Sequence, residues 1–413
     1  MNIWVIQTGE RLPLEAGTRM MRTGLLAQEL AGRKHNVTWW ASAFCHYTRK
    51  WVDDRGPVLA LSDNLSLHLL HGSGYRKNVS LKRFFDHALV ARRFTQAAEK
   101  AQRPDVIIAA LPDYRIAYAA YKYARRHNVP FILDLRDRWP WDFLHELPKF
   151  VQPIARLALA NDFRMAKRLI ARSDSLVTMM RSWDGWIKAM GRQKRPTDAV
   201  FYLGAGTLKP DDTKIREGTA TALRACEGRW PVLFIGAFNN RFWPKIAVDA
   251  ANLFKQNTAQ GGARPIFILA GDGDFMPELR KISADNPDIV LPGYVNDAEI
   301  AALLACAKVG LVTGNGDFEA MPNKVFTYLS GGVPILSSLD GELRAFLDTE
   351  QVGMTCRNGA EMYAAIKTLL DDEPRRADMA SSAATIFNER YEAGRLYGQY
   401  ADMVERMAAG AGG

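Results

Sequence analysis

The sequence predicts an α/β protein built from two doubly wound domains. The chain has 413 residues, which is too long for one ordinary hydrophobic core and suits two. Short apolar runs alternate with amphipathic segments along its length, in the order strand, loop, helix, strand. With 48% hydrophobic residues, the chain can fill two cores. We therefore expect largely parallel sheets covered by helices, with functional loops where strands pass into helices.

The N-terminal half begins with the pattern expected of such a domain. The long loop between its first strand and first helix contains Gly17. A glycine there would let the backbone approach a diphosphate, and an ordinary loop glycine is the alternative. Strands are expected at residues 2–8, 35–42, 105–112 and 130–137, and helices at about 20–31, 81–102 and 114–128.

Polar residues follow the strand expected at 130–137. Asp134, Arg136 and Asp137 lie at its C-terminal end. Because ligands of open α/β sheets bind beyond the carboxyl ends of strands, a carboxylate and a guanidinium here could engage an acceptor hydroxyl or a phosphate. An Asp–Arg pair that caps the strand end is the alternative.

Residues 139–173 are rich in aromatic, aliphatic and basic side chains. They could form an exposed apolar patch with a basic rim, which would suit docking at a bilayer and access to a lipid-linked acceptor. Buried packing is the alternative. The aromatic candidates are Trp139, Trp141, Phe143 and Phe150, and the basic ones are Lys149, Arg156, Arg164 and Lys167.

Charge is divided unevenly between the two halves. Residues 1–200 contain 33 Lys and Arg against 18 Asp and Glu, whereas residues 201–413 contain 21 against 27. The basic first half suits an anionic acceptor or an anionic membrane surface, and a generally basic surface is the alternative. Nucleic acid is not expected as a partner, because no binding motif accompanies the charge.

Cysteine usage and hydropathy point to a cytoplasmic protein that is soluble or lies on a membrane surface. The four cysteines are far apart in the sequence and lack metal-ligand spacing, which is typical of reduced cytosolic thiols. No targeting peptide is evident, and no apolar run reaches the roughly 18 residues of a membrane span.

The second half repeats the strand-loop-helix pattern after a polar linker near 209–212. A buried strand is expected at 231–240, followed by Arg241 and Lys245 at the start of a helix. Cations at that place can neutralise a diphosphate leaving group, and two solvated surface cations are the alternative. Further strand-loop-helix segments are expected at 265–282 and 289–312, and one long C-terminal helix from about 375 to 407.

The most informative stretch is residues 314–338, GNGDFEAMPNKVFTYLSGGVPILSS. A buried strand precedes it, an acidic loop includes Glu319, and a proline opens a helix. Asn323 and Lys324 would present free backbone N–H groups at the helix N-terminus, an anion site that the lysine charge strengthens. Glu319 could accept hydrogen bonds from sugar hydroxyls, so the stretch suggests a nucleotide-sugar site. An ordinary strand-loop-helix unit with a solvated acidic loop is the alternative.

This stretch resembles the donor-binding segment of retaining glycosyltransferases of the GT-B fold, family four. Members carry two glutamates eight positions apart, followed by a helix and a G-x-P turn. Glu319 matches the first glutamate, and Gly332 to Pro334 match the turn. Thr327 stands where the second glutamate usually binds the ribose, which is a departure from the family. The pattern P-N-K-x-F-x-Y-L-x-x-G-x-P, with D-x-R-D-x-W-P earlier in the chain, is similar to members that build bacterial surface polysaccharides.

The resemblance implies roles for other residues. Arg241 and Lys245 match a phosphate-binding pattern, Gly271 lies in a G-x-G turn that faces the nucleotide, and Tyr294 contacts the base. The loop of Gly17 would face the donor phosphates, and Asp137 would be a carboxylate on the acceptor side. No divalent metal and no cofactor are implied, because the nucleotide sugar, with a UDP-sugar favoured, is a substrate.

The resemblance covers nearly the whole chain and implies two Rossmann-like domains that face each other across a cleft. Residues 1–205 would form the acceptor-side domain and 206–385 the nucleotide-sugar-binding domain. Residues 386–413 would hold a helix crossing back to the first domain and a disordered tail.

The implied activity is retaining transfer of a hexose from a nucleotide sugar to a glycan or lipid-linked acceptor. It would serve surface polysaccharide or glycolipid biosynthesis, in the cytoplasm and at the inner face of the cytoplasmic membrane. A sugar-nucleotide epimerase of the same fold and a non-catalytic glycosyltransferase-like subunit are the alternatives.

Overall fold

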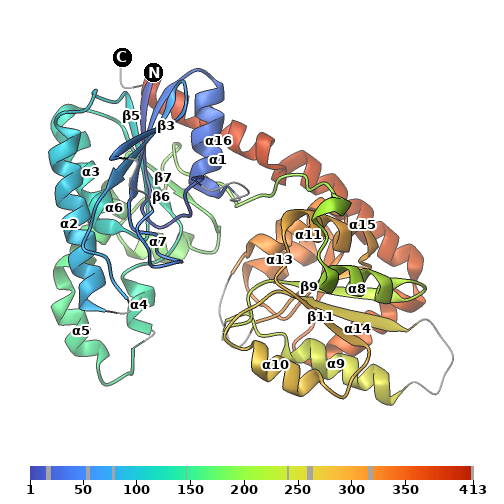
Figure 1. Ribbon diagram of the computed structural model, residues 1–413. Coiled ribbons are helices and arrows are strands. Elements are labelled where there is room, and N and C mark those ends of the chain that lie inside the picture. The colour runs from blue at the N-terminus through green and yellow to red at the C-terminus, as the bar shows by residue number, and fades with distance from the viewer. Residues whose placement is uncertain are drawn as a thin grey trace. The chain divides into compact units, whose positions relative to one another are not determined.

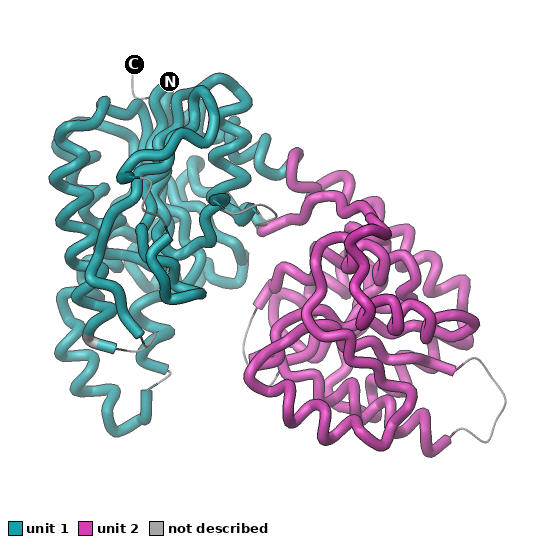
Figure 2. The backbone as a smooth tube through the Cα atoms, in the orientation of Figure 1, with its two compact units in different colours: residues 1–202, 396–413 teal, residues 203–395 magenta. Residues whose placement is uncertain are grey.

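The computed structural model describes residues 1–14, 20–52, 56–76, 80–145, 147–239, 241–257, 264–314 and 320–410. The chain divides into two compact units, unit 1 with residues 1–202 and 396–413 and unit 2 with residues 203–395 (Figure 2). Each unit is a mainly parallel sheet covered by helices, so the predicted α/β class with two Rossmann-like domains is confirmed. Two predicted site residues, Gly17 and Glu319, lie outside the described residues.

Unit 1 contains an eight-stranded sheet in the order β3-β4-β2-β1-β5-β6-β7-β8. All neighbours pair in parallel except β3 and β4, which form an antiparallel edge. Its strands are β1 (Asn2–Ile6), β2 (Asn36–Ser42), β3 (Val58–Ser62), β4 (Leu65–Leu70), β5 (Val106–Ala110), β6 (Phe131–Leu135), β7 (Ser175–Thr178) and β8 (Ala199–Val200). Its helices are α1 (Arg22–Gly32), α2 (Leu81–Ala98), α3 (Tyr114–His127), α4 (Trp141–His145), α5 (Gln152–Ala158), α6 (Ala160–Arg172) and α7 (Asp184–Ala189).

Helices cover both faces of the first sheet, with α2, α3 and α6 on one side and α1 on the other (Figure 1). The strands therefore read as continuous apolar runs, as in other parallel sheets buried on both faces. Trp4 of β1 meets Trp40 of β2 edge to face at 5.3 Å and Phe94 of α2 at 6.1 Å. All three side chains are almost fully buried, so large aromatic rings fill the space between this sheet and α2.

Unit 2 contains a six-stranded parallel sheet in the order β11-β10-β9-β12-β13-β14. Its strands are β9 (Trp230–Ile235), β10 (Pro265–Ala270), β11 (Ile289–Gly293), β12 (Val309–Val312), β13 (Ile335–Ser337) and β14 (Gly353–Thr355). Its helices are α8 (Glu217–Cys226), α9 (Lys245–Gln256), α10 (Met276–Ser283), α11 (Asp297–Cys306), α12 (Asn323–Ser330), α13 (Glu342–Glu350), α14 (Gly359–Asp371) and α15 (Glu373–Ile386). A short 3-10 turn (Asp212–Lys214) precedes α8.

The expectation of one long C-terminal helix is wrong, because the segment is broken near Glu392. After α15 the chain makes a π-helical turn (Phe387–Tyr391) and then an extended residue at Glu392 before α16 (Ala393–Ala409). Backbone bonds on both sides hold the break open, since Ala205 donates to the Tyr391 carbonyl at 3.1 Å and accepts from Ala393 at 2.9 Å. Helical propensity alone cannot reveal this pairing with a distant segment.

Most of α16 belongs to unit 1. Arg33, just after α1, donates to Asp402 at 2.6 Å and to Glu405 at 3.2 Å, and His35 contacts Glu405 at 2.8 Å. The Tyr400 ring, fully buried, stacks on Phe201 at 4.7 Å. The last helix is therefore held to unit 1 by packing as well as by charge.

Candidate functional site

The strand order of unit 2 reverses between β9 and β12. The chain runs outward from β9 through β10 to β11, then returns to pair β12 with the other side of β9. In open parallel sheets a ligand binds beyond the carboxyl ends of the strands at such a reversal. The residues that follow β9 and β12 are therefore the first place to look for a site.

A tight pair of glycine turns leaves the backbone bare at the ends of β9 and β10. Gly236 and Gly271 have φ of +152° and +147°. A Cβ on Gly271 would lie 1.8 Å from the Gly236 carbonyl oxygen, so the two turns pack backbone against backbone. The Gly236 N–H donates to the Ala270 carbonyl at 3.0 Å, and the Gly271 N–H to that of Gly293 at 2.8 Å. The predicted donor-binding Gly271 thus lies at this strand edge, where only glycine fits.

Helix α12, which follows β12, is fixed to the sheet by Tyr328. Its hydroxyl accepts the Ile235 N–H at 2.9 Å and lies 3.1 Å from the carbonyl oxygens of Leu233 and Leu311. Its ring occupies the space that a side chain at Gly310 would need. These bonds to both β9 and β12 place the start of α12 at the reversal point.

The Lys324 ammonium is buried at that start without a partner. Among the described residues, Nζ has no hydrogen-bond acceptor and almost no contact with solvent. It lies 3.9 Å from the centre of the Phe234 ring and 5.0 Å from that of Phe242. A side chain at Gly236 would come within 2.5 Å of it. Burial lowers the pKa of Lys324 to about 7.

Helix α12 has no side-chain cap at its N-terminus. Pro322 is the N-cap and carries no N–H, so Asn323 and Lys324 begin the helix with N–H groups that have no partner within the helix. The side chain of Asn323 is exposed. Together with the ammonium of Lys324, this helix end offers positive charge and N–H donors to an anion.

Thr327, the residue at the family's second glutamate position, points back along α12. It is buried, and its hydroxyl donates weakly to the Asn323 carbonyl at 3.4 Å. A threonine is too short to reach a ribose as a glutamate would. The described residues therefore supply no carboxylate at this position.

Arg241 and Lys245 lie between β9 and α9, on the same edge of the sheet. Lys245 is the first residue of α9, is exposed, and pairs with Asp249 one turn later at 2.7 Å. Arg241 is exposed, and its backbone N–H donates to the Asn239 side chain at 2.9 Å. Of the three predicted phosphate-binding cations, Lys324 is the one withdrawn from water.

Tyr294 follows β11 and is 63% exposed. Its carbonyl accepts a hydrogen bond from Arg216 at 2.6 Å, and the Arg216 guanidinium lies over its ring at 5.7 Å. Arg216 also pairs with Glu299 of α11. Burial disfavours ionisation of Glu299, but hydrogen bonds from Arg216 and the Asn296 backbone outweigh it and lower the pKa of Glu299 to about 2. This ion pair fixes the loop that presents Tyr294.

The corresponding edge of unit 1 carries a closed ion cluster around Asp134. Asp134, at the end of β6, is fully buried and accepts from Arg22 at 3.0 Å and from Arg136 at 2.8 Å. Arg136 also pairs with Glu10, and Arg22 donates to the carbonyl of Phe201 at 2.8 Å. Burial opposes ionisation of Asp134, yet the two arginines hold its pKa below the ordinary value. Asp134 and Arg136 are therefore structural, and Asp137, which is exposed, remains the candidate at this strand end.

Sequence reasoning missed a second polar group at this edge. Asp113, after β5, accepts from the Thr8 hydroxyl at 3.0 Å and lies 3.4 Å from Nδ1 of His87. Asp113 also caps α3 by accepting from the N–H groups of Arg115 and Ile116. The D-Y-R sequence after the strand at 105–112 signalled the cap, but nothing in the sequence placed Thr8 and His87 beside it.

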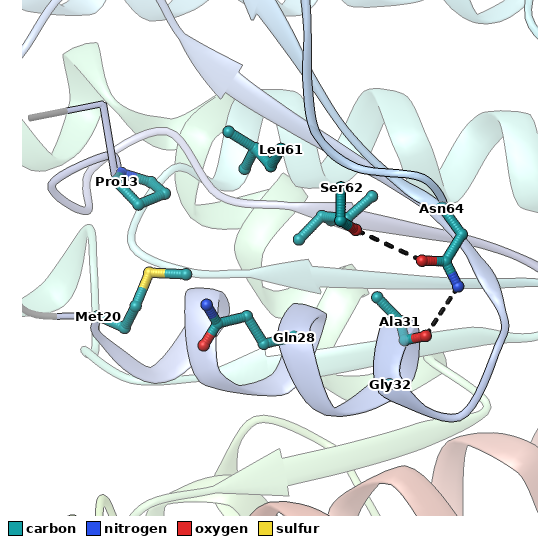
Figure 3. A pocket seen from close by; sticks show the side chains of 9 residues that line it. Pro13, Met20, Gln28, Ala31, Gly32, Leu61, Ser62 and Asn64 are labelled. Atoms are coloured by element: carbon teal, nitrogen blue, oxygen red, sulfur yellow. Dashed lines mark hydrogen bonds between the residues drawn. The ribbon is translucent and has the colours of Figure 1, made fainter.

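The surface hollow of about 540 Å³ in Figure 3 is a poor place for an anion. It lies along α1 and the turn between β3 and β4, where the Asn64 amide donates to the Ala31 carbonyl at 2.7 Å. No charged side chain is among the described residues that line it. Its walls are Pro13, Met20, Gln28, Ala31, Gly32, Leu61, Ser62, Asn64 and Leu65.

The described ranges hold neither a cluster of metal ligands nor a membrane-spanning helix. They contain no group of three or more His, Cys, Asp or Glu side chains arranged to hold a metal ion. They also contain no helix with the length and apolar character needed to cross a bilayer.

Comparisons with known proteins agree with this geometry. Residues 230–372 match the family described as Glycosyl transferases group 1. The chain is 26% identical over 256 residues to the amylovoran biosynthesis glycosyltransferase AmsK of Erwinia amylovora. That alignment covers 58% of each protein, so the chain spans somewhat more than half the length of this curated relative.

Solved structures show the fold over the whole chain. Sucrose-phosphate synthase from Thermosynechococcus elongatus superposes with a TM-score of 0.73 at 12% identity, covering 99% of both chains. HepE of Anabaena, solved in complex with UDP, superposes with a TM-score of 0.67 at 14% identity, covering 98% of this chain and 99% of that one. These structures have the GT-B fold, so the likeness shows that fold for this chain, and residues 230–372 match a glycosyltransferase family.

Proposed function

Because residues 230–372 match the Glycosyl transferases group 1 family in a chain of GT-B fold, we propose that this protein transfers a sugar from a nucleotide-sugar donor to an acceptor. The finer terms of the proposal are a UDP-sugar donor, retention of anomeric configuration and no requirement for a metal ion. The acceptor is a glycan or a lipid-linked glycan of surface polysaccharide or glycolipid assembly, reached by peripheral contact with the inner face of an anionic membrane.

One observation supports the donor class above the others. Among the residues that the structure describes, the buried ammonium of Lys324 has no partner at the start of α12, at the reversal of the second sheet. A buried charge without a partner is costly, and a bound diphosphate would supply the missing partner. The first N–H groups of α12 suit the same ligand.

The mechanism we propose is mainly electrostatic. Lys324, with Arg241 and Lys245 beside it in the sheet edge, would stabilise charge on the departing nucleoside diphosphate. Glu319 would hold the donor sugar through its hydroxyls. Tyr294 would contact the base. Asp137 is proposed as the carboxylate that engages the acceptor hydroxyl, and Gly17 as a contact of the donor phosphates.

A thermal-shift panel tests the donor class. UDP, GDP, ADP, CMP and TDP would be compared on the wild type, on Lys324→Met and on the control Lys281→Met, an exposed lysine of α10. Binding raises stability by RT ln(1 + [L]/Kd), about 2.7 kcal/mol at a hundredfold excess over Kd. We expect UDP to stabilise the wild type and Lys281→Met but not Lys324→Met. The absence of a shift with every nucleotide would contradict the proposal.

Lys245→Ala in the same panel separates the two predicted phosphate cations. Lys245 is exposed and already paired with Asp249, so its loss should weaken the UDP shift less than the loss of Lys324. If Lys245→Ala weakened the UDP shift as much as Lys324→Met does, or more, Lys245 would have to leave Asp249 and bind the donor.

A further inference from the structure

Three large apolar side chains are exposed on a short segment of unit 1. Phe150, Ile154 and Leu157 are 82%, 72% and 79% exposed. None of the seven residues of α5, which carries the last two, is buried. Single exposed apolar residues are common, but three within eight positions form a patch that needs an explanation.

Of the four aromatic residues expected in this patch, Phe150 is exposed, whereas Trp139, Trp141 and Phe143 pack against other rings. Phe143 is buried and packs on Trp139 at 5.4 Å between ring centres. Trp141 meets Phe163 of α6 at 5.3 Å and Trp186 of α7 at 5.1 Å, both edge to face. These rings pack α4 against α6 and α7, so the helices on both sides of the exposed segment are held in place.

The apolar patch continues into a basic stripe. Helical hydrogen bonds run across the junction of α5 and α6, since Leu159 donates to the Ala155 carbonyl and accepts from the Phe163 N–H, both at 2.9 Å. Side chains spaced three or four residues apart therefore share one side of the combined helix. The stripe consists of Ile154, Leu157, Arg164 and Arg168.

Cations surround the patch and lack counter-charges of their own. Residues 147–172 contain six Lys and Arg against a single acidic residue, Asp162. Asp162 is buried and paired with Arg115 at 2.7 Å. Within the described part of the chain, none of the six cations forms an ion pair with a carboxylate. They are Lys149, Arg156, Arg164, Lys167, Arg168 and Arg172, all exposed.

We propose that this surface, called the α5 patch and made of Phe150, Ile154, Leu157 and the six cations, docks on an anionic lipid bilayer. The apolar side chains would enter the boundary between headgroups and acyl chains while the cations contact lipid phosphates. A second copy of the chain is a poorer occupant, because a symmetric contact would press cations against cations. The inference names the docking surface for the membrane contact in the proposed function, and it rests on that function for the class of partner.

Vesicle co-sedimentation tests the α5 patch. Wild type would be mixed with phosphatidylcholine vesicles, with and without roughly 30% phosphatidylglycerol. The variant Ile154→Asp/Leu157→Asp removes the apolar contact, and the control Val58→Asp changes an exposed apolar residue of β3. We expect wild type and control to bind anionic vesicles only, and the double variant to remain in solution.

A second variant tests the cations of α6. Arg164→Gln/Lys167→Gln/Arg168→Gln should weaken binding roughly fivefold per cation removed, and added salt should weaken the wild type in the same direction. Equal binding to neutral vesicles, or unchanged binding of Ile154→Asp/Leu157→Asp, would overturn the proposal. So would a wild-type dimer, seen by sedimentation velocity, that this double variant turns into a monomer.

UDP binding measured on the same samples separates the two proposals. The α5 patch lies in unit 1 and the Lys324 site in unit 2, so the double variant should keep its UDP shift. Vesicle binding without any nucleotide shift would contradict the donor site alone. A nucleotide shift without vesicle binding would contradict the α5 patch alone.

Discussion

The carboxyl edges of the two sheets differ in whether a buried charge has partners of opposite charge. In unit 1, Asp134 is fully buried but two arginines surround it, and one of these is balanced again by Glu10. In unit 2, the Lys324 ammonium is also withdrawn from water, and within the described residues it has no hydrogen-bond partner and lies against the Phe234 ring and beside Gly236. The difference teaches that burial of a charge does not by itself mark a ligand site. A buried charge that lacks a partner does indicate a ligand site, because nothing in the folded chain offsets the free-energy cost of burying it.

Breaking the closed cluster should have the largest effect on stability. Asp134→Asn leaves Arg22 and Arg136 buried without their shared anion, and we expect a loss of about 3 to 5 kcal/mol. Because the folded-state pKa of Asp134 is lowered, its contribution is present above its unfolded pKa and is lost as pH falls through the folded value. Urea unfolding of the full chain against pH measures both.

Asp137→Asn is the matched control for that change. Asp137 is exposed and directly follows Arg136 of the cluster, so its substitution should change stability by about 0.5 kcal/mol at most. If Asp134→Asn were as mild as Asp137→Asn, the cluster around Asp134 would not be a structural one.

The glycine turn of unit 2 should be nearly as sensitive. Gly271→Ala places a Cβ 1.8 Å from the Gly236 carbonyl and needs a φ that alanine avoids, so we expect a loss of about 3 kcal/mol. Gly32→Ala, at the end of α1 with no atom near the new Cβ, should instead stabilise by about 0.5 to 1 kcal/mol. Thermal denaturation measures the stability of both variants. If Gly271→Ala were as stable as Gly32→Ala, the turn at Gly271 would be able to relax around the new side chain.

Removing the unpartnered charge should have a smaller effect of opposite sign. Lys324→Met keeps the length of the side chain and removes the buried ammonium, so we expect a gain of about 1 to 3 kcal/mol near pH 6. The folded pKa of Lys324, about 7, lies below its unfolded value, so the unfolded chain binds the extra proton between the two. Wild-type stability should therefore rise with pH above 7 while that of Lys324→Met does not, and the gap should close. A wild type more stable than the variant at every pH would mean that Lys324 has a partner.

The fold was predictable from sequence because its signals are local. Continuous apolar runs such as VIIAA at 106–110 and PIFILA at 265–270 mark strands buried on both faces, and the glycines after β9 and β10 mark the turns. The break at Glu392 was not predictable, since it depends on pairing with Ala205, nearly two hundred residues away. The local periodicity of the sequence does not predict such a long-range contact.

The sequence predicted the kind of site, but not which of its cations is buried. Arg241, Lys245, Gly271, Tyr294, Asn323 and Lys324 all follow strands of unit 2 at the carboxyl edge, as the strand-loop-helix pattern predicts. The sequence offered Arg241, Lys245 and Lys324 as phosphate-binding cations, and burial singles out Lys324, because only the folded chain shows which cation is withdrawn from water. An exposed apolar patch was one of the two alternatives for residues 139–173, but only the folded chain shows that Ile154 and Leu157 are exposed, since apolar residues on a helix normally predict a buried face.

Titration calorimetry with UDP at several pH values tests most directly whether the Lys324 ammonium binds the diphosphate. A bound diphosphate must hold the ammonium in its charged form, so binding above pH 7 takes up a proton. The account predicts that wild-type affinity falls by up to about tenfold per pH unit above 7, and that Lys324→Met binds weakly with no such trend. Equal affinity of wild type and Lys324→Met for UDP at every pH would contradict it.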